Sequence, residues 1–406
     1  MDAGQPARAA ERAQGTPGEV FRTFLKLGLT SFGGPIAHLG YFREEIVVRR
    51  RWIDEATYAD LVALCQFLPG PASSQVGFAL GLMRAGWLGA FAAFLAFTLP
   101  SAVLLVVFAM TAASITGPVG EGALHGLKIV AVAIVAQAVW GMARSLCPDR
   151  ERAAIAVLAV AVLAFAPGAS GMIVAILAGA AGGLLLRWGA TGTRDGQAVT
   201  SVRPAVSTGA LILFAALLVG LPLIASGDQA LAVVDSFYRA GALVFGGGHV
   251  VLPLLDAEVV QRGWVSADAF LAGYGAAQAV PGPLFTFAAY LGAVLGPAPN
   301  GIAGAALALG AIFLPGFLLL VGVLPFWERF RSVAAAQSLM QGANAAVVGI
   351  LAAALYDPVF TTAIHGLADL ALALAGFVAL VASKAPPWAV VIGSAAGGIA
   401  LALAGI

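Results

Sequence analysis

Long apolar stretches separated by short polar segments dominate the pattern of this chain. Several of them reach the ~20 residues that an α-helix needs to cross a hydrocarbon core of about 30 Å. Shorter ones, such as 153–165, need flanking residues to reach the interface. Only helices or closed barrels satisfy their own backbone hydrogen bonds in lipid. The pattern predicts an α-helical bundle in a bilayer, with apolar segments at 153–167, 171–186, 207–225, 301–324, 340–356 and 386–406.

Two apolar segments near the N-terminus are interrupted. The segment 21–41 contains Phe32-Gly33-Gly34-Pro35, and the segment 57–83 is divided by Leu68-Pro69-Gly70-Pro71. Gly and Pro inside an apolar run break a helix. We therefore predict two broken or re-entrant elements, followed by spanning helices near 87–114, 125–145, 153–167 and 171–187.

This arrangement occurs twice. Phe24-x-Lys26-x-Gly28-x3-Phe32-Gly33-Gly34 returns, with an offset of 213 residues, as Phe237-x-Arg239-x-Gly241-x3-Phe245-Gly246-Gly247. The match continues with Glu45-x3-Arg49 and Glu258-x3-Arg262, Trp52 and Trp264, and then Gln66-x2-Pro69-Gly70-Pro71 and Gln278-x2-Pro281-Gly282-Pro283. A duplicated unit that keeps its glycines, prolines and charges is typical of the internal repeat of a transporter.

The distribution of Lys and Arg indicates how the two repeats are oriented, because these residues are enriched in cytoplasmic loops. Four arginines (Arg43 and Arg49–Arg51) follow the first Phe-Gly-Gly motif, whereas only Arg262 follows the second. The loop 117–122 has no Lys or Arg, whereas its counterpart carries Arg329 and Arg331. The bias reverses between the halves, which predicts inverted topology with 207–225 as the unpaired linking helix.

The chain accordingly divides into four parts: a disordered cytosolic tail (1–20), a first repeat (21–190), a basic loop with the linking helix (191–230) and an inverted second repeat (231–406). The tail lacks the apolar core and cleavage pattern of a signal peptide. We expect nine crossings, or up to thirteen if each broken element traverses fully, and a periplasmic C-terminus. The predicted fold class is an all-α polytopic membrane protein with two inverted-topology repeats and broken or re-entrant helices.

Composition excludes several function classes. The chain is 61% hydrophobic and 10% charged, against about 25% charged for a soluble domain. It contains no GxxxxGK[ST] for ATP, no HExxH and no Ser-His-Asp spacing, and Cys65 and Cys147 have no partner spacing. We therefore expect no enzyme, no metal and no cofactor. The net charge of +1 gives no reason to expect a nucleic-acid partner.

The four helix breaks are the main candidates for a binding site. Irregular backbone at membrane depth occurs only where it lines a cavity or is buried in protein. Free N–H groups at helix N-termini, approached through glycine, favour anions. Hinges and close-packing positions are the alternative explanation. The candidate residues are Phe32, Gly33, Gly34, Pro69, Gly70, Pro71, Phe245, Gly246, Gly247, Pro281, Gly282 and Pro283.

Charged and amide side chains near the breaks extend this set. Lys26 and Arg239 occupy equivalent positions six residues before each Phe-Gly-Gly motif. A cation inside a membrane suggests function, although each can instead extend to the interface. Gln66 and Gln278 precede the Pro-Gly-Pro turns and can offer amide donors to an oxyanion.

Carboxylates provide candidates for proton coupling. Glu45 and Arg49, like Glu258 and Arg262, have i,i+4 spacing, which allows a structural salt bridge on a helix. Alternatively, Glu45 or Glu258 carries a proton, which requires burial. Asp60, which has no acidic counterpart in the second half, is a further candidate or simply an acid at a helix start.

The chain resembles the chromate transporter family of bacteria and archaea, in its long two-domain form. The resemblance covers residues 20–405 and rests on Phe32-Gly33-Gly34-Pro35, the segment Glu44–Trp52 and the two Pro-Gly-Pro motifs. One departure is Gly248, which stands where the first half has Pro35 and suggests a softer hinge. The resemblance implies secondary active efflux of chromate, with sulfate as a competing tetrahedral dianion.

The leading hypothesis is a chromate exporter in the bacterial inner membrane, with a cytoplasmic N-terminus, working by alternating access and driven by the proton motive force. The alternatives are a transporter of sulfate or another small oxyanion, an anion channel and, as a third class, a membrane enzyme. The expected partners are the oxyanion and the lipid bilayer, and a homodimer stays open beside a monomer.

Overall fold

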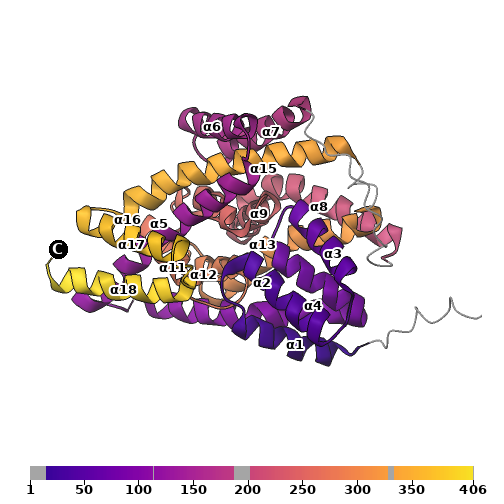
Figure 1. Ribbon diagram of the computed structural model, residues 1–406, viewed down its shortest axis with the longest axis horizontal. Coiled ribbons are helices and arrows are strands. Elements are labelled where there is room, and N and C mark those ends of the chain that lie inside the picture. Colours follow the sequence, from indigo (N-terminus) through magenta and orange to yellow (C-terminus); the bar gives the residue numbers. More distant parts are fainter. Residues whose placement is uncertain (1–14, 113, 187–201, 328–332, 406) are drawn as a thin grey trace, which may run out of the picture.

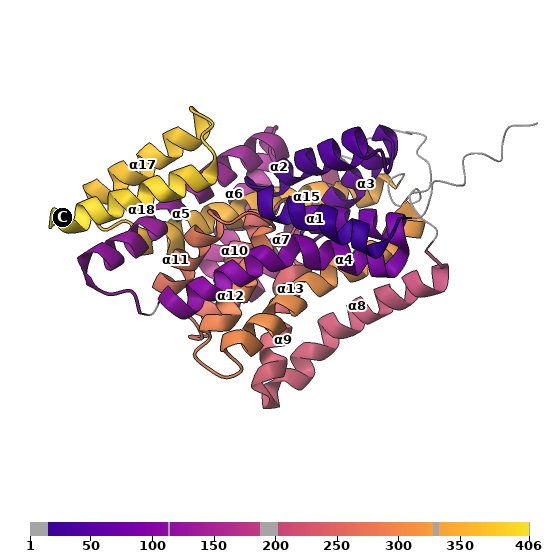
Figure 2. The same cartoon turned by 90° about the horizontal axis from the view of Figure 1, so that it is seen from below.

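The computed structural model describes residues 15–112, 114–186, 202–327 and 333–405, and all regular elements in these ranges are helical (Figures 1 and 2). Six helical segments are long and apolar enough to cross a membrane. These findings confirm an all-α polytopic membrane protein. The six segments contain α4 (Ala72–Ala112), α5 (Gly117–Leu146), α7 (Ala169–Leu186), α8 (Pro204–Ile224), α13 (Gly301–Val323) and α15 (Ala334–Ala354).

The first half contains the two predicted breaks. Helix α1 (Pro17–Thr30) ends before Gly33, and the chain resumes as α2 (Gly34–Phe42) and the π-helix η1 (Arg43–Arg49). Helix α3 (Glu55–Phe67) ends before Gly70, after which α4 begins. Non-helical dihedral angles at Ala85 and Gly86 divide α4, so its second part matches the span predicted at 87–114. Helices α5, α6 (Arg150–Phe165) and α7 match the other three predicted spans.

Two of the four predicted parts of the chain, the tail and the basic loop, are described only in part. Helix α1 begins at Pro17, within the segment assigned to the tail, and the Thr16 hydroxyl caps it by accepting from the Glu19 N–H. The rest of the tail, most of the basic loop (187–201) and the counterpart arginines Arg329 and Arg331 lie outside the described residues. The linking helix is α8, followed by the short η2 (Ala225–Gly227). It runs along the outer edge of the bundle (Figure 2).

The second half repeats the element order of the first, including a π-helix at the equivalent place. A broken helix comes first, then a second broken helix, then long helices. Its elements are α9 (Gln229–Ala242), η3 (Gly248–Val250), α10 (Val251–Leu255), η4 (Asp256–Val260), α11 (Ala267–Ala277), η5 (Leu284–Thr286), α12 (Phe287–Val294), α13, η6 (Leu324–Phe326), α15, η7 (Leu355–Phe360), α16 (Thr361–Ala363), α17 (Leu367–Val381) and α18 (Pro387–Leu403).

Each first helix packs on the long helix of its own half through a glycine that the repeat retains. A Cβ on Gly28 of α1 would lie 2.8 Å from the Phe97 carbonyl of α4. A Cβ on Gly241 of α9 would lie 2.1 Å from the Ile312 carbonyl of α13. Small residues allow this close backbone approach between membrane helices. The two glycines therefore have the same packing role.

The last helices of the two halves are exchanged. Helix α18 of the second half packs along α5 of the first, and α7 of the first half packs along α15 of the second (Figure 1). Gly122 of α5 lies against Gly398, and Gly126 lies against Ser394, so α18 runs antiparallel to α5. Every one of these contacts joins one half to the other.

The reciprocal pair has the same geometry. Gly179 of α7 meets Gly342 of α15, and Gly183 meets Ser338, so α7 and α15 are also antiparallel. The exchange buries small-residue faces of both halves against each other. The two repeats therefore form one interlocked bundle rather than two separate domains.

Candidate functional site: the meeting point of four helix breaks

The four breaks lie together at the junction of the halves. The N–H of Gly282 donates to the carbonyl of Ser31 over 2.9 Å, and the N–H of Gly70 donates to the carbonyl of Val244 over 2.8 Å. Ser31 and Val244 are equivalent in the repeat, as are Gly70 and Gly282. The Pro-Gly-Pro turn of each half is thus bonded to the Phe-Gly-Gly break of the other half.

Glycine is required at the centre of both Pro-Gly-Pro turns. Gly70 and Gly282 have φ angles of +116° and +106°, which side chains on L-residues rarely allow. A Cβ on Gly70 would lie 3.1 Å from the Cα of Gly316, and one on Gly282 would lie 2.8 Å from the hydroxyl of Ser101. Gly316 and Ser101 both follow the proline of a long helix. The contacts are therefore reciprocal here as well.

Pro35 and Gly248 meet at the centre of this exchange. They occupy equivalent positions, and a Cβ on Gly248 would lie 3.1 Å from Cγ of Pro35. The same position of the two repeats is therefore in direct contact across the junction of the halves. There is room for one proline ring and no second side chain. This steric limit gives a structural reason why Gly248 replaces the proline of the first half. From the sequence, the same difference suggested a softer hinge.

Helical segments begin at all four breaks. Helix α2 begins after Gly33, η3 after Gly247 and η5 after Pro283, and none of these three residues supplies a side-chain cap. Helix α4 begins directly after Pro71. The first N–H groups of a helix have no partner within the helix and carry a partial positive charge. The breaks therefore offer backbone donors to an anion.

Buried polar atoms without a protein partner accompany the breaks. Among the residues that the structure describes, they include Ser31 Oγ, Ser74 Oγ and Gln75 Oε1 in the first turn of α4, Thr98 Oγ1 before the proline of α4, and Gln278 Nε2. An unpaired buried donor costs about 1–3 kcal/mol, so a bound ligand or water is the usual explanation. Apart from Gln278, the sequence-based candidate set missed these residues.

Of the missed hydroxyls, Ser74 is the one that the repeat itself could have revealed. Thr286 is its equivalent, so a hydroxyl stands three residues after the second proline of both turns. Thr286 differs in that its hydroxyl already donates to the Pro283 carbonyl over 2.7 Å. The first-half hydroxyl is therefore the one available to a ligand.

The remaining break residues are less deeply placed. Gly33 and Gly247 are exposed, whereas Phe32 and Phe245 are half-buried. The Phe32 ring lies 6.4 Å from the Trp388 ring of α18, and Phe245 packs against the larger hydrophobic core. Gln66 is exposed on α3, so the two glutamines that the sequence paired have different surroundings.

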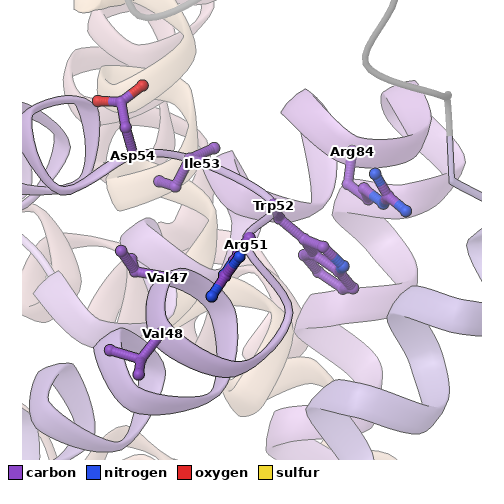
Figure 3. A pocket seen from close by; sticks show the side chains of 7 residues that line it. All are labelled: Val47, Val48, Arg51, Trp52, Ile53, Asp54 and Arg84. Carbon is purple, nitrogen blue, oxygen red and sulfur yellow. The ribbon is translucent and has the colours of Figure 1, made fainter.

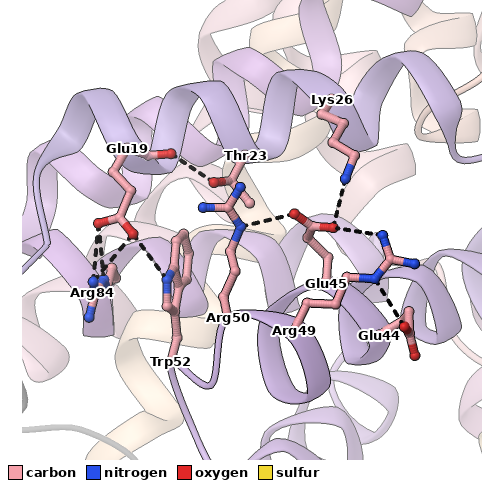
Figure 4. Close-up of polar contacts among 9 residues, drawn as sticks. All are labelled: Glu19, Thr23, Lys26, Glu44, Glu45, Arg49, Arg50, Trp52 and Arg84. Carbon is pink, nitrogen blue, oxygen red and sulfur yellow. Dashed lines mark hydrogen bonds and ion pairs between the residues drawn. The ribbon is translucent and has the colours of Figure 1, made fainter.

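In the first half, the predicted cation and carboxylate form a network at the edge of the bundle (Figure 4). Glu45 accepts from Lys26 over 2.8 Å and from Arg50 over 2.9 Å, and Arg49 lies 3.8 Å away. The hydrogen bond from Lys26 is the main reason why the pKa of Glu45 is lowered. Lys26 is 52% exposed, so it reaches the surface rather than the centre of the bundle.

The second half builds a more buried version of this network. Arg239 pairs with Asp235 and lies 3.5 Å from Glu258, which also pairs with Arg262 over 2.9 Å. The Glu258 side chain is only 3% exposed and that of Arg239 is 22% exposed. Both predicted i,i+4 contacts, Glu45–Arg49 and Glu258–Arg262, are present.

Sequence comparison of the halves missed the acids of this second network. Asp235 and Asp256 are buried, yet their first-half equivalents are Arg22 and Arg43. Asp256 has one carboxylate oxygen without a protein partner, and Gln261 donates to the other over 3.3 Å. Asp60, the acid that was predicted, is half-buried on α3.

A separate basic pocket of about 650 Å³ lies next to the first network (Figure 3). Trp52 lies between two arginines, with the Arg50 and Arg84 guanidinium carbons 5.8 Å and 5.2 Å from its ring. Glu19 fixes this group by accepting from both Trp52 and Arg84. The pocket is away from the breaks and is lined by Val47, Val48, Arg51, Trp52, Ile53, Asp54 and Arg84.

Two interlocked repeats, paired helix breaks and membrane-length helices define a polytopic membrane protein with an internal duplication. The family model described as Chromate transporter matches residues 18–184 and 231–399, once in each half. This chain belongs to the chromate transporter family.

Similar proteins include a chromate transport protein of Pseudomonas aeruginosa, which is 30% identical over 85% of this chain and 82% of its own length. A probable chromate transport protein of Synechococcus elongatus is 30% identical over 89% of this chain and 88% of its own. A chromate transport protein of Cupriavidus metallidurans is 28% identical over 87% and 84%. No solved structure matches the chain.

Proposed function

We propose that this protein exports chromate across the bacterial inner membrane as a secondary active transporter. The observation that carries the proposal is the pair of reciprocal hydrogen bonds, Gly282 to Ser31 and Gly70 to Val244, which joins the four breaks into one site. Chromate is a tetrahedral dianion, and backbone N–H groups at helix starts suit such a ligand. The family membership and the names of the relatives support chromate as the substrate.

The substrate is expected at the breaks rather than on the two predicted cations. Lys26 and Arg239 are already paired with Glu45 and Glu258, and a paired cation has less charge to offer. Ser74, Thr98 and Gln278 have unpaired donors in addition to the backbone. Lys26 and Arg239 then act at a distance, by attracting the anion and by exchanging partners during transport.

Alternating access follows from inverted repeats, and antiparallel packing supports the inversion. Helix α18 is the counterpart of α7, and α15 is the counterpart of α5. The chain reverses its direction after α5 and again after α6, so α5 and α7 point the same way. Helices α18 and α15 oppose α5 and α7 respectively, as inverted counterparts should.

A buried acid of the second half is the proposed proton carrier. Glu45 is a poor carrier because three cations surround it and its pKa is lowered, chiefly by Lys26. Asp256 and Glu258 are 5% and 3% exposed, and Asp256 has an oxygen without a protein partner. A site of this kind can take up and release a proton as its surroundings change.

Uptake of labelled chromate into inside-out membrane vesicles tests the function. Parent vesicles should accumulate chromate against its gradient when a proton gradient is imposed, and sulfate, the other tetrahedral dianion, should compete. Ser74→Ala should raise the apparent KM about tenfold, because a hydrogen bond to a charged ligand is worth about 1.5–3 kcal/mol. Asp256→Asn should keep chromate exchange while losing gradient-driven accumulation.

Thr286→Val is the matched control for the site, because its hydroxyl already donates to the protein. Equal kinetics for Ser74→Ala and Thr286→Val would place the ligand elsewhere, and normal uptake by Lys26→Ala and Arg239→Ala would remove any role for these cations. Uptake that only follows the chromate gradient would identify a channel. Stronger transport of sulfate than of chromate would identify sulfate as the substrate.

Single cysteines at Arg49 and Arg262 test the orientation of the halves. Both arginines are exposed and occupy equivalent positions. Inverted repeats place them on opposite sides, so a membrane-impermeant maleimide added to intact cells should label only Arg262→Cys. Labelling of both from one side would refute the inversion, and an N-terminal reporter in the same cells locates the N-terminus.

A further inference from the structure

A group of metal-ligand side chains joins the two halves and contains none of the residues of the breaks. His125 lies on α5 of the first half, His365 lies between α16 and α17 of the second half, and Asp369 lies in the first turn of α17. Their potential ligand atoms all lie within 4.8 Å of one another. From this group we propose a binding site for a divalent metal ion of the Zn²⁺ class, independent of the substrate site.

The side chains are already oriented around one point. His125 Nε2 lies 2.9 Å from Asp369 Oδ1, and the His125 and His365 rings stack at 5.5 Å with an interplanar angle of 10°. The other oxygen of Asp369 accepts from the backbone N–H of His365 over 2.9 Å. A carboxylate fixed by the backbone holds its free oxygen in place for a ligand, as in many metal sites.

The distances require only a small change. Tetrahedral zinc bonds of about 2.0–2.2 Å place two ligand atoms roughly 3.3 Å apart. His125 and Asp369 are slightly closer than this, and a metal would replace the proton that they share. His365 is exposed and stands between α16 and α17, so its ring can approach without moving a helix.

The ligand set indicates the kind of metal. Two imidazoles and one carboxylate suit Zn²⁺ and its neighbours, whereas Mg²⁺ and Ca²⁺ prefer oxygen ligands only. Three protein ligands leave one position for water. Such an ion would tie α5 to α17 and so limit the motion of one half against the other.

The junction of α6 with α15 is the counterpart of the junction of α17 with α5, and it does not repeat this ligand set. There, Arg152 donates to Gln341 while also pairing with Asp149 over 3.2 Å. An arginine and an amide cannot replace the histidines as ligands. Only one of the two related junctions therefore has the chemistry for a metal.

Metal binding by the purified, tag-free, full-length protein in detergent tests the site. After dialysis against Zn²⁺, the parent should retain one ion per chain, and Co²⁺ should give visible d–d absorption bands. His125→Ala, His365→Ala and Asp369→Asn should each weaken Zn²⁺ binding by at least about tenfold. Binding should also weaken in acid, because metal binding requires histidine without its second proton.

Gln341→Ala is the control at the equivalent junction, and Glu121→Gln is the control one turn before His125 on α5. Both should bind Zn²⁺ like the parent. Retention of Zn²⁺ by all three ligand variants, or no binding by a folded parent, would overturn the proposal. Chromate uptake by His125→Ala is measured alongside, and its persistence with loss of metal would leave the proposed transport function intact.

Discussion

The two halves share a backbone plan but divide the polar chemistry between them. At the breaks, the unpaired hydroxyls Ser31, Ser74 and Thr98 belong to the first half, whereas their counterparts are Val244, the internally bonded Thr286 and Phe313. At the ion-pair networks the second half has more buried acids than the first: Asp235, Asp256 and Glu258, against Glu45. An internal duplication thus supplies a symmetric framework on which substrate binding and coupling can be assigned to different halves.

The two ion-pair networks also differ in how far their cations are exposed to solvent. The first network has long side chains that are 34–59% exposed around Glu45. The cations of the second network, Arg239 and Arg262, are 22% and 37% exposed, so its ion pairs are less solvated, although the acids are buried in both networks, Glu45 at 8% and Glu258 at 3%. Solvated ion pairs contribute little to stability. The second network is therefore expected to be the more sensitive to a lost charge.

The largest expected effect is on stability at Glu258. Glu258→Gln leaves Arg262 without its ion-pair partner and removes one partner of the less exposed Arg239. Arg239 keeps Asp235 and Arg262 is 37% exposed, so the loss should be about 2 kcal/mol, below the 3–5 kcal/mol of a buried charge left unpaired. The apparent Tm in detergent should fall clearly, as measured by thermal unfolding of the purified protein.

Glu45→Gln is the matched variant in the first half. Its partners are more exposed, so the loss should be nearer 1 kcal/mol. The comparison fails if the two variants lose the same stability, or if Glu45→Gln is the worse of the two. High salt should reduce the effect of Glu45→Gln more than that of Glu258→Gln, because exposed pairs are screened more strongly.

The sequence predicted the parts of the fold that depend on short-range chemistry. All four breaks are present because Gly and Pro act locally, and α8 is present because its long apolar run contains no charged residue. The exchange of α7 and α18 between halves was not predicted. Small residues such as Gly126 and Gly342 indicate close approach but not which helix approaches.

The candidate site was predicted in part for the same reason. Repeated residues such as Gly70 and Gly282 could be found by comparing the halves. Asp256 and Thr98 could not, because their counterparts are Arg43 and Phe313. Comparison within the chain therefore recovers the symmetric framework and loses the asymmetric chemistry, which is the part that differs between the halves.

The smaller effect concerns Pro35 and Gly248, where the halves touch. Gly248→Ala places a methyl group 3.1 Å from the Pro35 ring, and overpacking costs about 1–3 kcal/mol. Because the contact is between equivalent positions, Pro35→Ala should create the missing space. The double variant Pro35→Ala/Gly248→Ala should therefore be more stable than Gly248→Ala alone, as measured by the apparent Tm. Additive losses in the double variant would mean that these residues do not share one space, and a direct contact between the halves at this position would have to be abandoned.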